Sequence, residues 1–512
     1  MKTDKNASSK IISLGDAEIV AQQLRGLSQK IAHCHGVFDL LHPGHVQHFL
    51  AAKKMADILI VSITADEHVN KGPGRPLFNQ SIRADTIAAI GIVDYVVVSN
   101  YPTAIETIGT LKPDFYVKGS DYQSANDDVT GKIVLEKETV ESFGGKLVFT
   151  DEITSSSSKL INQFFSNLSV DAQGWLKEFR LNSGFERTVS WLDKIENLKV
   201  LVLGEVIIDR YTECTPLAKS SKDPILAFQR GQSLTYPGGI LTIANNCKGW
   251  SCEVSAISFV NEKCSDFKQV SIKIDSEITL DFVSVKDRPT ILKHRFVDSG
   301  SSTRLFEYYD FKDAALEVND ENRILEKINS RVLGSDVVIL ADYGHGFFTD
   351  RIISKLEVES KFLAVNTQAN AGNRGYNTIS KYRKADLLSL NGSELQLELR
   401  DKNPDYMRII PQMMVDKKST RAILTLGGDG MMVFDKSGEH ILVPALATRI
   451  VDKVGAGDSV LSISSLLTAV GAPLDVVGFV ASLVAAHEIS QLGHQSGLSR
   501  NDLKKHAKSI LG

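Results

Sequence analysis

Residues 35–45, HGVFDLLHPGH, place two histidines three positions apart where one predicted element gives way to the next. The apolar run at 31–34 predicts a buried strand, and residues 46–56 carry apolar side chains at helical spacing. Pro43 stands at the first helical position, where proline is favoured. The sequence therefore predicts a strand, a short loop and a helix, with His42 and the second histidine at the helix N-terminus.

A helix N-terminus is suited to phosphate, because its first backbone N–H groups lack partners and its dipole is positive there. The imidazoles of His42 and His45 can donate hydrogen bonds to a triphosphate as charge develops on the departing pyrophosphate, with no covalent intermediate. Two other interpretations are a surface loop with solvated histidines and a zinc pair. A His-x-x-His pair without a third ligand is a poor zinc site.

This stretch resembles the HxGH nucleotidyltransferases, in the cytidylyltransferase-like branch that includes glycerol-3-phosphate cytidylyltransferases and heptose-1-phosphate adenylyltransferases. The resemblance implies that His42 and His45 are catalytic and that Gly36 and Phe38 contact the nucleotide. It also implies two further catalytic residues, Lys71 in the basic loop KGPGRP and Arg83, which meet substrate phosphate.

Two later segments extend the resemblance. Residues 118–122, KGSDY, are similar to the family's nucleotide loop and imply roles for Lys118 and Asp121. Residues 156–161, SSSKLI, resemble its closing element with serines in place of threonines, and imply nucleotide contacts from Ser156 and Ser157. A serine tract is more often a flexible linker, but here it precedes an apolar helical stretch whose N-terminus its hydroxyls can cap.

A second group of motifs lies near the C-terminus, where VDKVGAGDS at 451–459 precedes a long apolar helix. Glycines at a helix start let backbone amides approach an anion, and Asp458 can accept the proton of a nearby hydroxyl. Alone, this run is also compatible with a simple helix cap. Upstream, Asn391 and Glu394 offer oxygen ligands suited to hydrated Mg²⁺, and Thr425–Gly430 forms a glycine-rich turn after a strand.

In this order and spacing the three elements resemble the ribokinase/PfkB sugar kinases, across residues 197–512, and heptose-7-phosphate kinases in particular. The resemblance implies that Asn391 and Glu394 bind the nucleotide and hold Mg²⁺ through water. It also implies a site for a monovalent cation such as K⁺ at Asp452. It further implies nucleotide contacts from Gly428, Gly430, Gly455, Ala456 and Gly457.

The sugar side of that resemblance is altered. Asp209, Gly238 and Gly239 match the family's substrate-binding residues, and the β-rich stretches 224–236 and 278–310 are similar to its lid. Three nearby positions depart from the heptose kinases. Glu205 stands where they have aspartate, Thr242 where they have asparagine, and residues 366–370 where they have an Asp-Pro-Lys segment. A sugar kinase is therefore better supported than a heptose kinase.

The length of 512 residues predicts more than one domain. Strand-like runs alternate with helical patterns, which predicts an α/β fold with parallel sheets. We expect a Rossmann-like nucleotidyltransferase domain at 1–165, a connector at 166–196 and a ribokinase-like domain with a small β lid at 197–512.

Composition excludes several classes of function. The net charge of −4 and the dispersed basic residues give no pull toward nucleic acid or acidic membranes. We expect no membrane segment, because no apolar stretch reaches spanning length. Five cysteines without a CxxC pair suit reduced thiols in the cytoplasm.

Together, the two resemblances imply a bifunctional enzyme like the ADP-heptose synthases of lipopolysaccharide biosynthesis, with the domain order reversed from their common arrangement. Its substrates would be ATP, possibly CTP, and a sugar or sugar phosphate, with Mg²⁺ and possibly K⁺ as cofactors, in a homo-oligomer. The alternatives are a nucleotidyltransferase with a non-catalytic, sugar-sensing kinase-like domain, and a pure binding or scaffolding protein.

Overall fold

The computed structural model describes residues 7–119, 132–150 and 167–511, apart from residues 221, 251, 302, 374 and 494–496. The chain forms two compact units, residues 1–167 with 504–512, and residues 168–503. The expected connector lies almost wholly in the second unit as α7 (Val170–Leu181) and α8 (Gly184–Lys194). Both helices pack on that unit, through Phe179 against Phe479 and through an ion pair of Arg187 with Asp475 at 2.8 Å.

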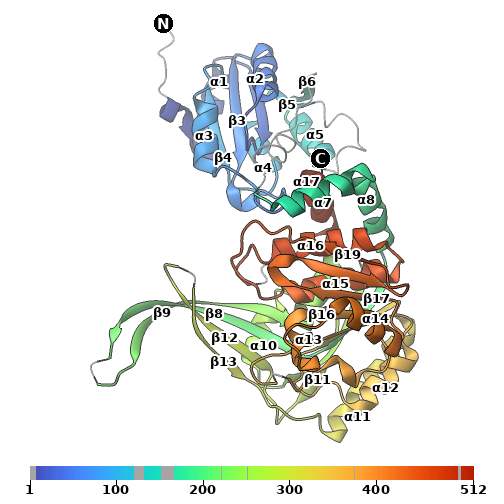
Figure 1. The fold of residues 1–512 in the computed structure, drawn as a ribbon. Coiled ribbons are helices and arrows are strands. Elements are labelled where there is room, and N and C mark those ends of the chain that lie inside the picture. Colours follow the sequence, from blue (N-terminus) through green and yellow to red (C-terminus); the bar gives the residue numbers. More distant parts are fainter. Residues whose placement is uncertain are drawn as a thin grey trace. The chain divides into compact units, whose positions relative to one another are not determined.

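The first unit contains a parallel six-stranded sheet of order β1-β4-β3-β2-β5-β6 (Figure 1). Successive strand residues face opposite sides, so Val61 packs under α2 and α3 while Ile60 packs under α1. The strands are β1 (Ile11–Ile12), β2 (Ile31–Gly36), β3 (Ile58–Thr64), β4 (Tyr95–Ser99), β5 (Phe115–Gly119) and β6 (Lys146–Thr150). The helices are α1 (Leu14–Gly26), α2 (Pro43–Met55), α3 (Gln80–Ala88), α4 (Ile105–Leu111) and α5 (Lys132–Ser142).

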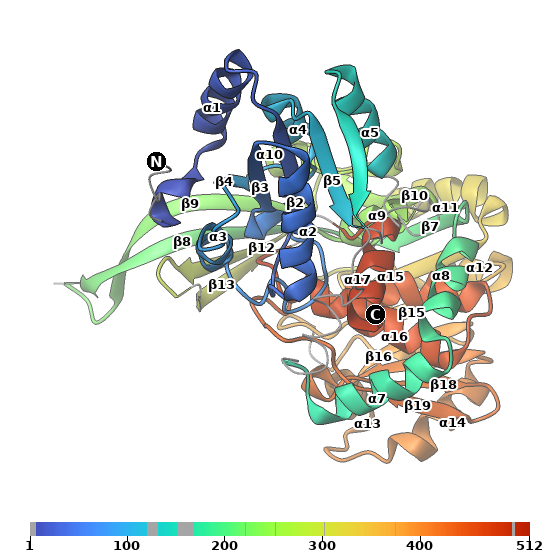
Figure 2. The ribbon, with the colours of Figure 1, turned by 90° about the horizontal axis from the view of Figure 1, so that it is seen from above.

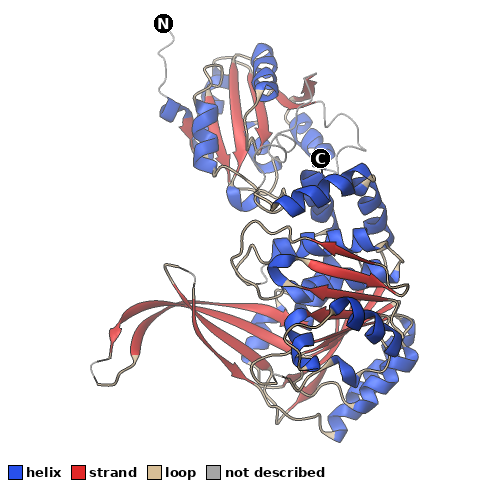
Figure 3. Cartoon of the chain, in the orientation of Figure 1, coloured by secondary structure: helices blue, strands red, loops and turns tan. Residues whose placement is uncertain are grey.

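The second unit is built on a nine-stranded sheet of order β11-β10-β7-β14-β15-β16-β17-β18-β19, antiparallel only at its last two pairings. These strands are β7 (Lys199–Gly204), β10 (Glu253–Asn261), β11 (Thr279–Val285), β14 (Val337–Asp342), β15 (Leu363–Thr367), β16 (Leu387–Asn391), β17 (Arg421–Thr425), β18 (Met431–Asp435) and β19 (His440–Val443). The alternation predicted from the sequence is confirmed, as Figure 3 shows for the mixture of helices and strands.

Helices cover both faces of this sheet. The side chains of α11, α12 and α14 join one core cluster, whereas α9, α15 and α16 pack on the opposite side, where α15 is buried from Ser459 to Thr468. The helices that follow β9 in this unit are α9 (Ile240–Gly249), α10 (Ser265–Ser271), α11 (Val318–Arg331), α12 (Asp350–Glu359), α13 (Gly392–Leu399), α14 (Tyr406–Asp416), α15 (Ala456–Ala469) and α16 (Leu474–Glu488). The last helix, α17 (Arg500–Leu511), begins in this unit and continues into residues of the first. Within the described part of the chain, no helix has the length and apolar character needed to span a membrane.

A separate four-stranded sheet of order β13-β12-β8-β9 forms the predicted lid. Its strands are β8 (Val206–Lys219), β9 (Leu226–Gly239), β12 (Ile291–Asp298) and β13 (Arg304–Asp310), and Figures 1 and 2 show the β8–β9 hairpin reaching far beyond the nine-stranded sheet. The expectation that 278–310 belongs wholly to the lid is wrong. Residues 279–285 form β11, which pairs in parallel with β10 at the edge of the main sheet.

Candidate functional sites

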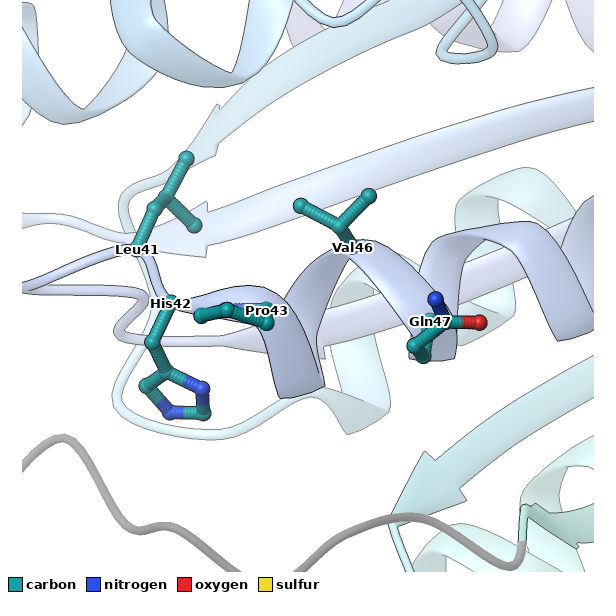
Figure 4. Close-up of a pocket in the computed structure, with 5 residues that line it drawn as sticks. All are labelled: Leu41, His42, Pro43, Val46 and Gln47. Atoms are coloured by element: carbon teal, nitrogen blue, oxygen red, sulfur yellow. The ribbon is translucent and has the colours of Figure 1, made fainter.

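The predicted histidine pair lies at the N-terminus of α2. His42 is the N-cap residue, and its Nδ1 accepts a hydrogen bond from the Gly44 N–H at 3.2 Å. A neutral His42 therefore carries its proton on Nε2. The rings of His42 and His45 stack with centroids 3.9 Å apart. In Figure 4 the His42 imidazole projects from the helix start, beside a cavity of about 420 Å³ lined by Leu41, His42, Pro43, Val46 and Gln47.

Burial and neighbouring groups keep His45 neutral. Burial lowers the pKa of His45 to about 3, with further lowering by His42, Lys71 and His48. A neutral imidazole can still donate one hydrogen bond, so His45 can act as a donor without adding charge to the site. Phe38 packs its ring against the ring of His45 at 5.2 Å.

Gly36 and Phe38, which we expected to contact the nucleotide, pack behind His45. A Cβ at Gly36 would lie 3.0 Å from the Phe38 ring, and Phe38 itself is buried with a positive φ of 49°. A larger residue at position 36 would push this ring, and with it His45, out of place.

Lys71 lies close enough to His45 for its charge to contribute to the lowered pKa of that histidine. Burial, followed by repulsion from Arg75, lowers the pKa of Lys71 itself. The loop around it is held by Asp39, which lies 3.5 Å from Arg75 and accepts the backbone N–H groups of Leu77 and Phe78 at 2.9 and 3.0 Å. The basic loop is thus held in place by Asp39, and its Lys71 interacts electrostatically with the histidine at the α2 N-terminus.

Arg83 is placed differently from our expectation of a phosphate contact. Its side chain is fully buried in α3. The guanidinium donates hydrogen bonds to the carbonyl oxygens of Phe78 (2.9 Å), Val37 (2.6 Å) and Thr64 (2.9 Å) and to the Asp66 carboxylate (2.6 Å). Four of its five N–H groups are therefore used to join the loop after β2, the end of β3 and the loop before α3.

The nucleotide loop is only partly described. Lys118 is 9% exposed at the end of β5 and forms an ion pair with Glu136 at 3.1 Å. Asp121, Ser156 and Ser157, the other expected nucleotide contacts, lie outside the described residues.

In the second unit, Asp458 lies in the first turn of α15 and accepts a hydrogen bond from the Tyr343 hydroxyl at 2.8 Å. Burial raises the pKa of Asp458 to about 7, with opposing effects from Lys293 and Asp209. A carboxyl group with such a pKa can take up a proton near neutral pH. Tyr343 directly follows β14, and its role was not predicted from the sequence.

The glycines of the GAGD turn have distinct roles. Gly455 has a φ of 85°, and a Cβ there would lie 2.9 Å from the Glu488 carboxylate. At Gly457, by contrast, a Cβ would meet no atom within 4 Å, so the space beside it is open. Ala456 begins α15, so its backbone and the open space at Gly457 leave this end of the helix accessible to a phosphate group.

The sugar-side residues come from the lid strands. Asp209 on β8 forms an ion pair with Arg295 on β12, and a side chain on Gly238 of β9 would overlap the Asp209 carboxylate. Gly239 has a φ of 60°, where glycine is favoured. Lys293 of β12 pairs in register with Asp209 and is 8% exposed.

The sequence analysis missed Lys293 and Arg295, because no short motif marks them. Burial lowers the pKa of Lys293, whereas Asp209 and Asp458 both raise it. This lysine therefore interacts electrostatically with the carboxylates of the sugar side and of the α15 helix start. The only signal in the sequence was the alternating pattern of 291–297.

The expected Mg²⁺ ligands lie at the end of β16 and the start of α13. Asn391 caps α13, and its Oδ1 accepts the Ser393 N–H at 2.9 Å. Glu394 accepts the Ala369 N–H at 3.0 Å, and burial raises the pKa of Glu394 to about 7. Glu394 lines a cavity of about 800 Å³ together with Glu307 and Tyr309 of β13. A half-buried carboxylate beside an open cavity fits a hydrated Mg²⁺.

The glycine-rich turn after β17 is held by close backbone packing. Gly430 has a φ of 93°, and a side chain there would overlap the Val443 carbonyl. At Gly428 a Cβ would meet nothing within 4 Å, so this position leaves room beside the turn.

Asp452 does not suit the K⁺ that the resemblance implied. Its carboxylate is ion-paired with Arg304 of β13 and accepts the Tyr211 hydroxyl at 2.6 Å. It also accepts the backbone N–H groups of Val454 at 3.0 Å and Gly493 at 3.4 Å. A guanidinium and three other donors already occupy this carboxylate, so the residues present compensate its charge without a metal ion.

The three departures from the heptose kinases have structural partners of their own. Glu205 is fully buried and accepts the N–H groups of Tyr343 (3.1 Å), His345 (3.0 Å) and Phe347 (3.3 Å). The Thr242 hydroxyl donates to the Pro237 carbonyl at 3.0 Å, and the Asn366 amide donates to the Ser389 carbonyl at 2.9 Å. Glu205 thus fixes the loop that carries Tyr343.

Comparison with known proteins supports this division of roles. Residues 33–163 match the cytidylyltransferase-like family, and residues 197–501 match the pfkB family carbohydrate kinases. The bifunctional protein HldE of Paramagnetospirillum magneticum is 39% identical over 152 residues, which are 29% of this chain and 30% of that protein. HldE of Gluconobacter oxydans is 42% identical over 131 residues, or 25% and 26%. The matched region thus spans less than a third of these relatives.

Solved structures resemble the second unit. Phosphofructokinase-2 from Escherichia coli in complex with fructose-6-phosphate has a TM-score of 0.50 at 17% identity, covering 61% of this chain and 99% of that chain. The same enzyme in complex with potassium has a TM-score of 0.51 at 19% identity and the same coverage. At such identities the likeness concerns the fold alone. Because the kinase match covers more than half of its residues, the chain belongs to the pfkB family of carbohydrate kinases, with a cytidylyltransferase-like domain preceding the kinase domain.

Proposed function

We propose that the protein is a bifunctional enzyme that makes a nucleotide-activated sugar. The second unit transfers a phosphoryl group from ATP to a sugar or sugar phosphate. The first unit then joins the resulting sugar phosphate to a nucleotide and releases pyrophosphate. The observation that carries the proposal is that one chain holds two helix N-termini suited to phosphate, with His42 and His45 at α2 and Asp458 at α15.

In the kinase reaction, Asp458 accepts the proton of the sugar hydroxyl as that oxygen bonds to the γ-phosphorus of ATP. Tyr343 orients the carboxylate through its 2.8 Å hydrogen bond. The amides at Gly455–Gly457 stabilise the charge on the transferring phosphoryl oxygens. Asp209, Gly238 and Gly239 bind the sugar, and Gly428 and Gly430 shape the nucleotide side.

Mg²⁺ held by Asn391 and Glu394, through water, would neutralise charge on the ATP phosphates. We propose no K⁺ at Asp452, since Arg304 already compensates that carboxylate.

In the transferase reaction, a phosphate oxygen of the sugar phosphate attacks the α-phosphorus of the nucleoside triphosphate, and pyrophosphate leaves. His42 and His45 donate hydrogen bonds to the phosphate oxygens as charge develops. Lys71 binds phosphate in the same space, and Lys118 with Asp121, Ser156 and Ser157 binds the nucleotide. Arg83 is a positioning residue that fixes these loops.

The sequence resemblance to heptose-1-phosphate adenylyltransferases and heptose-7-phosphate kinases supports a nucleotide-activated heptose as the product, in an ADP- or CDP-linked form for surface polysaccharides. The whole protein should be incubated with ATP, CTP and candidate sugar phosphates, and the products identified by mass. A nucleotide sugar with equimolar pyrophosphate is the expected result. The absence of any nucleotide sugar across the panel would contradict the proposal.

A sugar-sensing second unit without catalysis is the second candidate, and the altered side chains at Thr242 and Asn366 favour it. The discriminating measurement is sugar-dependent ADP release by the full chain carrying His45→Ala, which isolates the kinase step. ADP release supports the bifunctional enzyme, whereas sugar binding without turnover supports the sensor.

A further inference from the structure

The last helix, α17, crosses the boundary between the two units along the sequence. It begins at Arg500, and its residues from Lys504 onward belong to the first unit. These end residues are not a loose tail, since His506 is 2% exposed and Ala507 is fully buried. A segment that follows the kinase sequence is therefore part of the nucleotidyltransferase core.

His506 contacts the basic loop directly. Its Nε2 is hydrogen bonded to the Asn70 side-chain oxygen, so Nε2 carries the proton. Its ring also packs beside Gly72, where a Cβ would lie 3.5 Å from the ring. Gly72 has a φ of 90° and reverses the chain between Lys71 and Arg75. His506 therefore holds the loop on both sides of Lys71.

The position of Lys71 depends on this support. Burial and the nearby Arg75 disfavour the positive charge of Lys71. Holding this side chain near Arg75 and His45 therefore costs free energy, which other contacts of the loop must offset. On the Arg75 side the loop is fixed by Asp39, at 3.5 Å. On the other side of Lys71, the Asn70 side chain is hydrogen bonded to His506.

We propose that residues 504–511 complete the nucleotidyltransferase domain, and that His506 is a positioning residue that holds the 70–75 loop in the conformation that binds the sugar phosphate. The proposal rests on the nucleotidyltransferase activity proposed above. It means that the end of the chain, beyond the kinase fold, sets the phosphate affinity of the N-terminal site.

The test is His506→Ala in the full chain. We expect the KM for the sugar phosphate in nucleotidyl transfer to rise about 3- to 10-fold, the range for one lost hydrogen bond, with a smaller change in kcat. His506→Gln, whose amide N–H can take the place of Nε2–H, should restore most of the affinity. Asn501→Ala, an exposed position on the same helix, is the matched control and should change nothing.

A double-mutant cycle with Asn70→Ala separates this contact from general stability. If the two side chains act together, the double variant should lose little more affinity than either single variant. A merely structural role predicts a lowered melting temperature with kcat and KM both impaired, and that result would overturn the proposal, as would an unchanged KM in a folded His506→Ala protein.

Hydrogen exchange of the backbone amides at 70–75 provides a readout independent of activity. Exchange should accelerate about 3- to 10-fold in His506→Ala and stay unchanged in Asn501→Ala. Unchanged exchange would refute the contact. If the wild-type protein made no nucleotide sugar but exchange changed as expected, the proposed function would fail while the assignment of residues 504–511 to the first unit stood.

Discussion

The two proposed phosphate sites of this protein would stabilise negative charge with different kinds of side chain. At the α2 N-terminus the key side chains are two histidines, of which His45 is kept neutral by burial, and burial also lowers the pKa of the nearby Lys71. At the α15 N-terminus the key side chain is a carboxylate, balanced by Lys293. The difference follows from the chemistry. A nucleotidyl transfer needs donors for a leaving pyrophosphate, whereas a phosphoryl transfer to a hydroxyl also needs a group that accepts a proton.

The sites also differ in how they are assembled. The histidines and the aromatic ring beneath them come from one stretch of eleven residues, 35–45. The carboxylate site draws on β8, β12, β14 and α15, which are separated by long sequence intervals. The histidine pair should therefore tolerate changes in the second unit, whereas the carboxylate site should be sensitive to changes in the lid.

Among the changes that test this comparison, Asp458→Asn should have the largest effect on activity. Asparagine keeps the shape but cannot accept the proton, so sugar-dependent ADP release should fall about 10²- to 10⁴-fold while nucleotidyl transfer continues. ATP affinity and melting temperature should be retained. A lowered melting temperature with normal ADP release would instead make Asp458 a helix cap, worth about 1 kcal/mol.

The reciprocal change is His45→Ala or His42→Ala. Loss of one preorganised donor should lower pyrophosphate release about 10²- to 10³-fold and leave ADP release intact. Nucleotidyl transfer and ADP release should be measured on the same preparation. Near-normal transfer in His45→Ala would remove the functional assignment of the α2 N-terminus.

Arg83→Lys tests whether Arg83 fixes the loops of the first site or binds phosphate directly. Lysine cannot reproduce four hydrogen bonds in a planar arrangement, so we expect a loss of about 2–3 kcal/mol in the free energy of unfolding together with weakened transfer. Denaturant unfolding measures the first and pyrophosphate release the second. Full stability with lost transfer would show that Arg83 touches phosphate after all.

The pH dependence of the kinase step should report the carboxylate. Because Asp458 must be deprotonated to act, and burial raises its pKa to about 7, kcat/KM for the sugar should fall about tenfold per pH unit below that value. The stability effect has the opposite sense. A raised pKa favours the folded state at low pH, and this contribution is lost as pH rises through about 7. Asp458→Asn should reduce that loss, and a flat rate profile between pH 5 and 8 would contradict the base role.

The smallest effect is expected at Asp452. If the Arg304 guanidinium takes the place of a monovalent cation, replacing K⁺ by Na⁺ should leave wild-type ADP release unchanged. Arg304→Ala should lower it about fivefold and make it responsive to K⁺. Arg323→Ala, an exposed arginine on α11, is the control. K⁺ activation of the wild-type protein would show that the cation displaces Arg304.

The sequence alone determined the features that are local. It predicted the strand–loop–helix around His42, the alternation of strands and helices in both units, β-rich stretches for the lid and the GAGD helix start, because each depends on side-chain periodicity or on neighbours within a few positions. It also indicated both families, which residues 33–163 and 197–501 confirm.

Only the tertiary structure decided which side chains meet across long sequence distances. It paired Tyr343 with Asp458, placed Lys293 opposite Asp209, used Arg83 and Glu205 to tie loops together, and brought His506 to Asn70. It also moved residues 279–285 from the lid to the main sheet. Periodicity gives the exposed and buried faces of an element, but the partner of a strand or of a buried charge is chosen by packing of the whole chain.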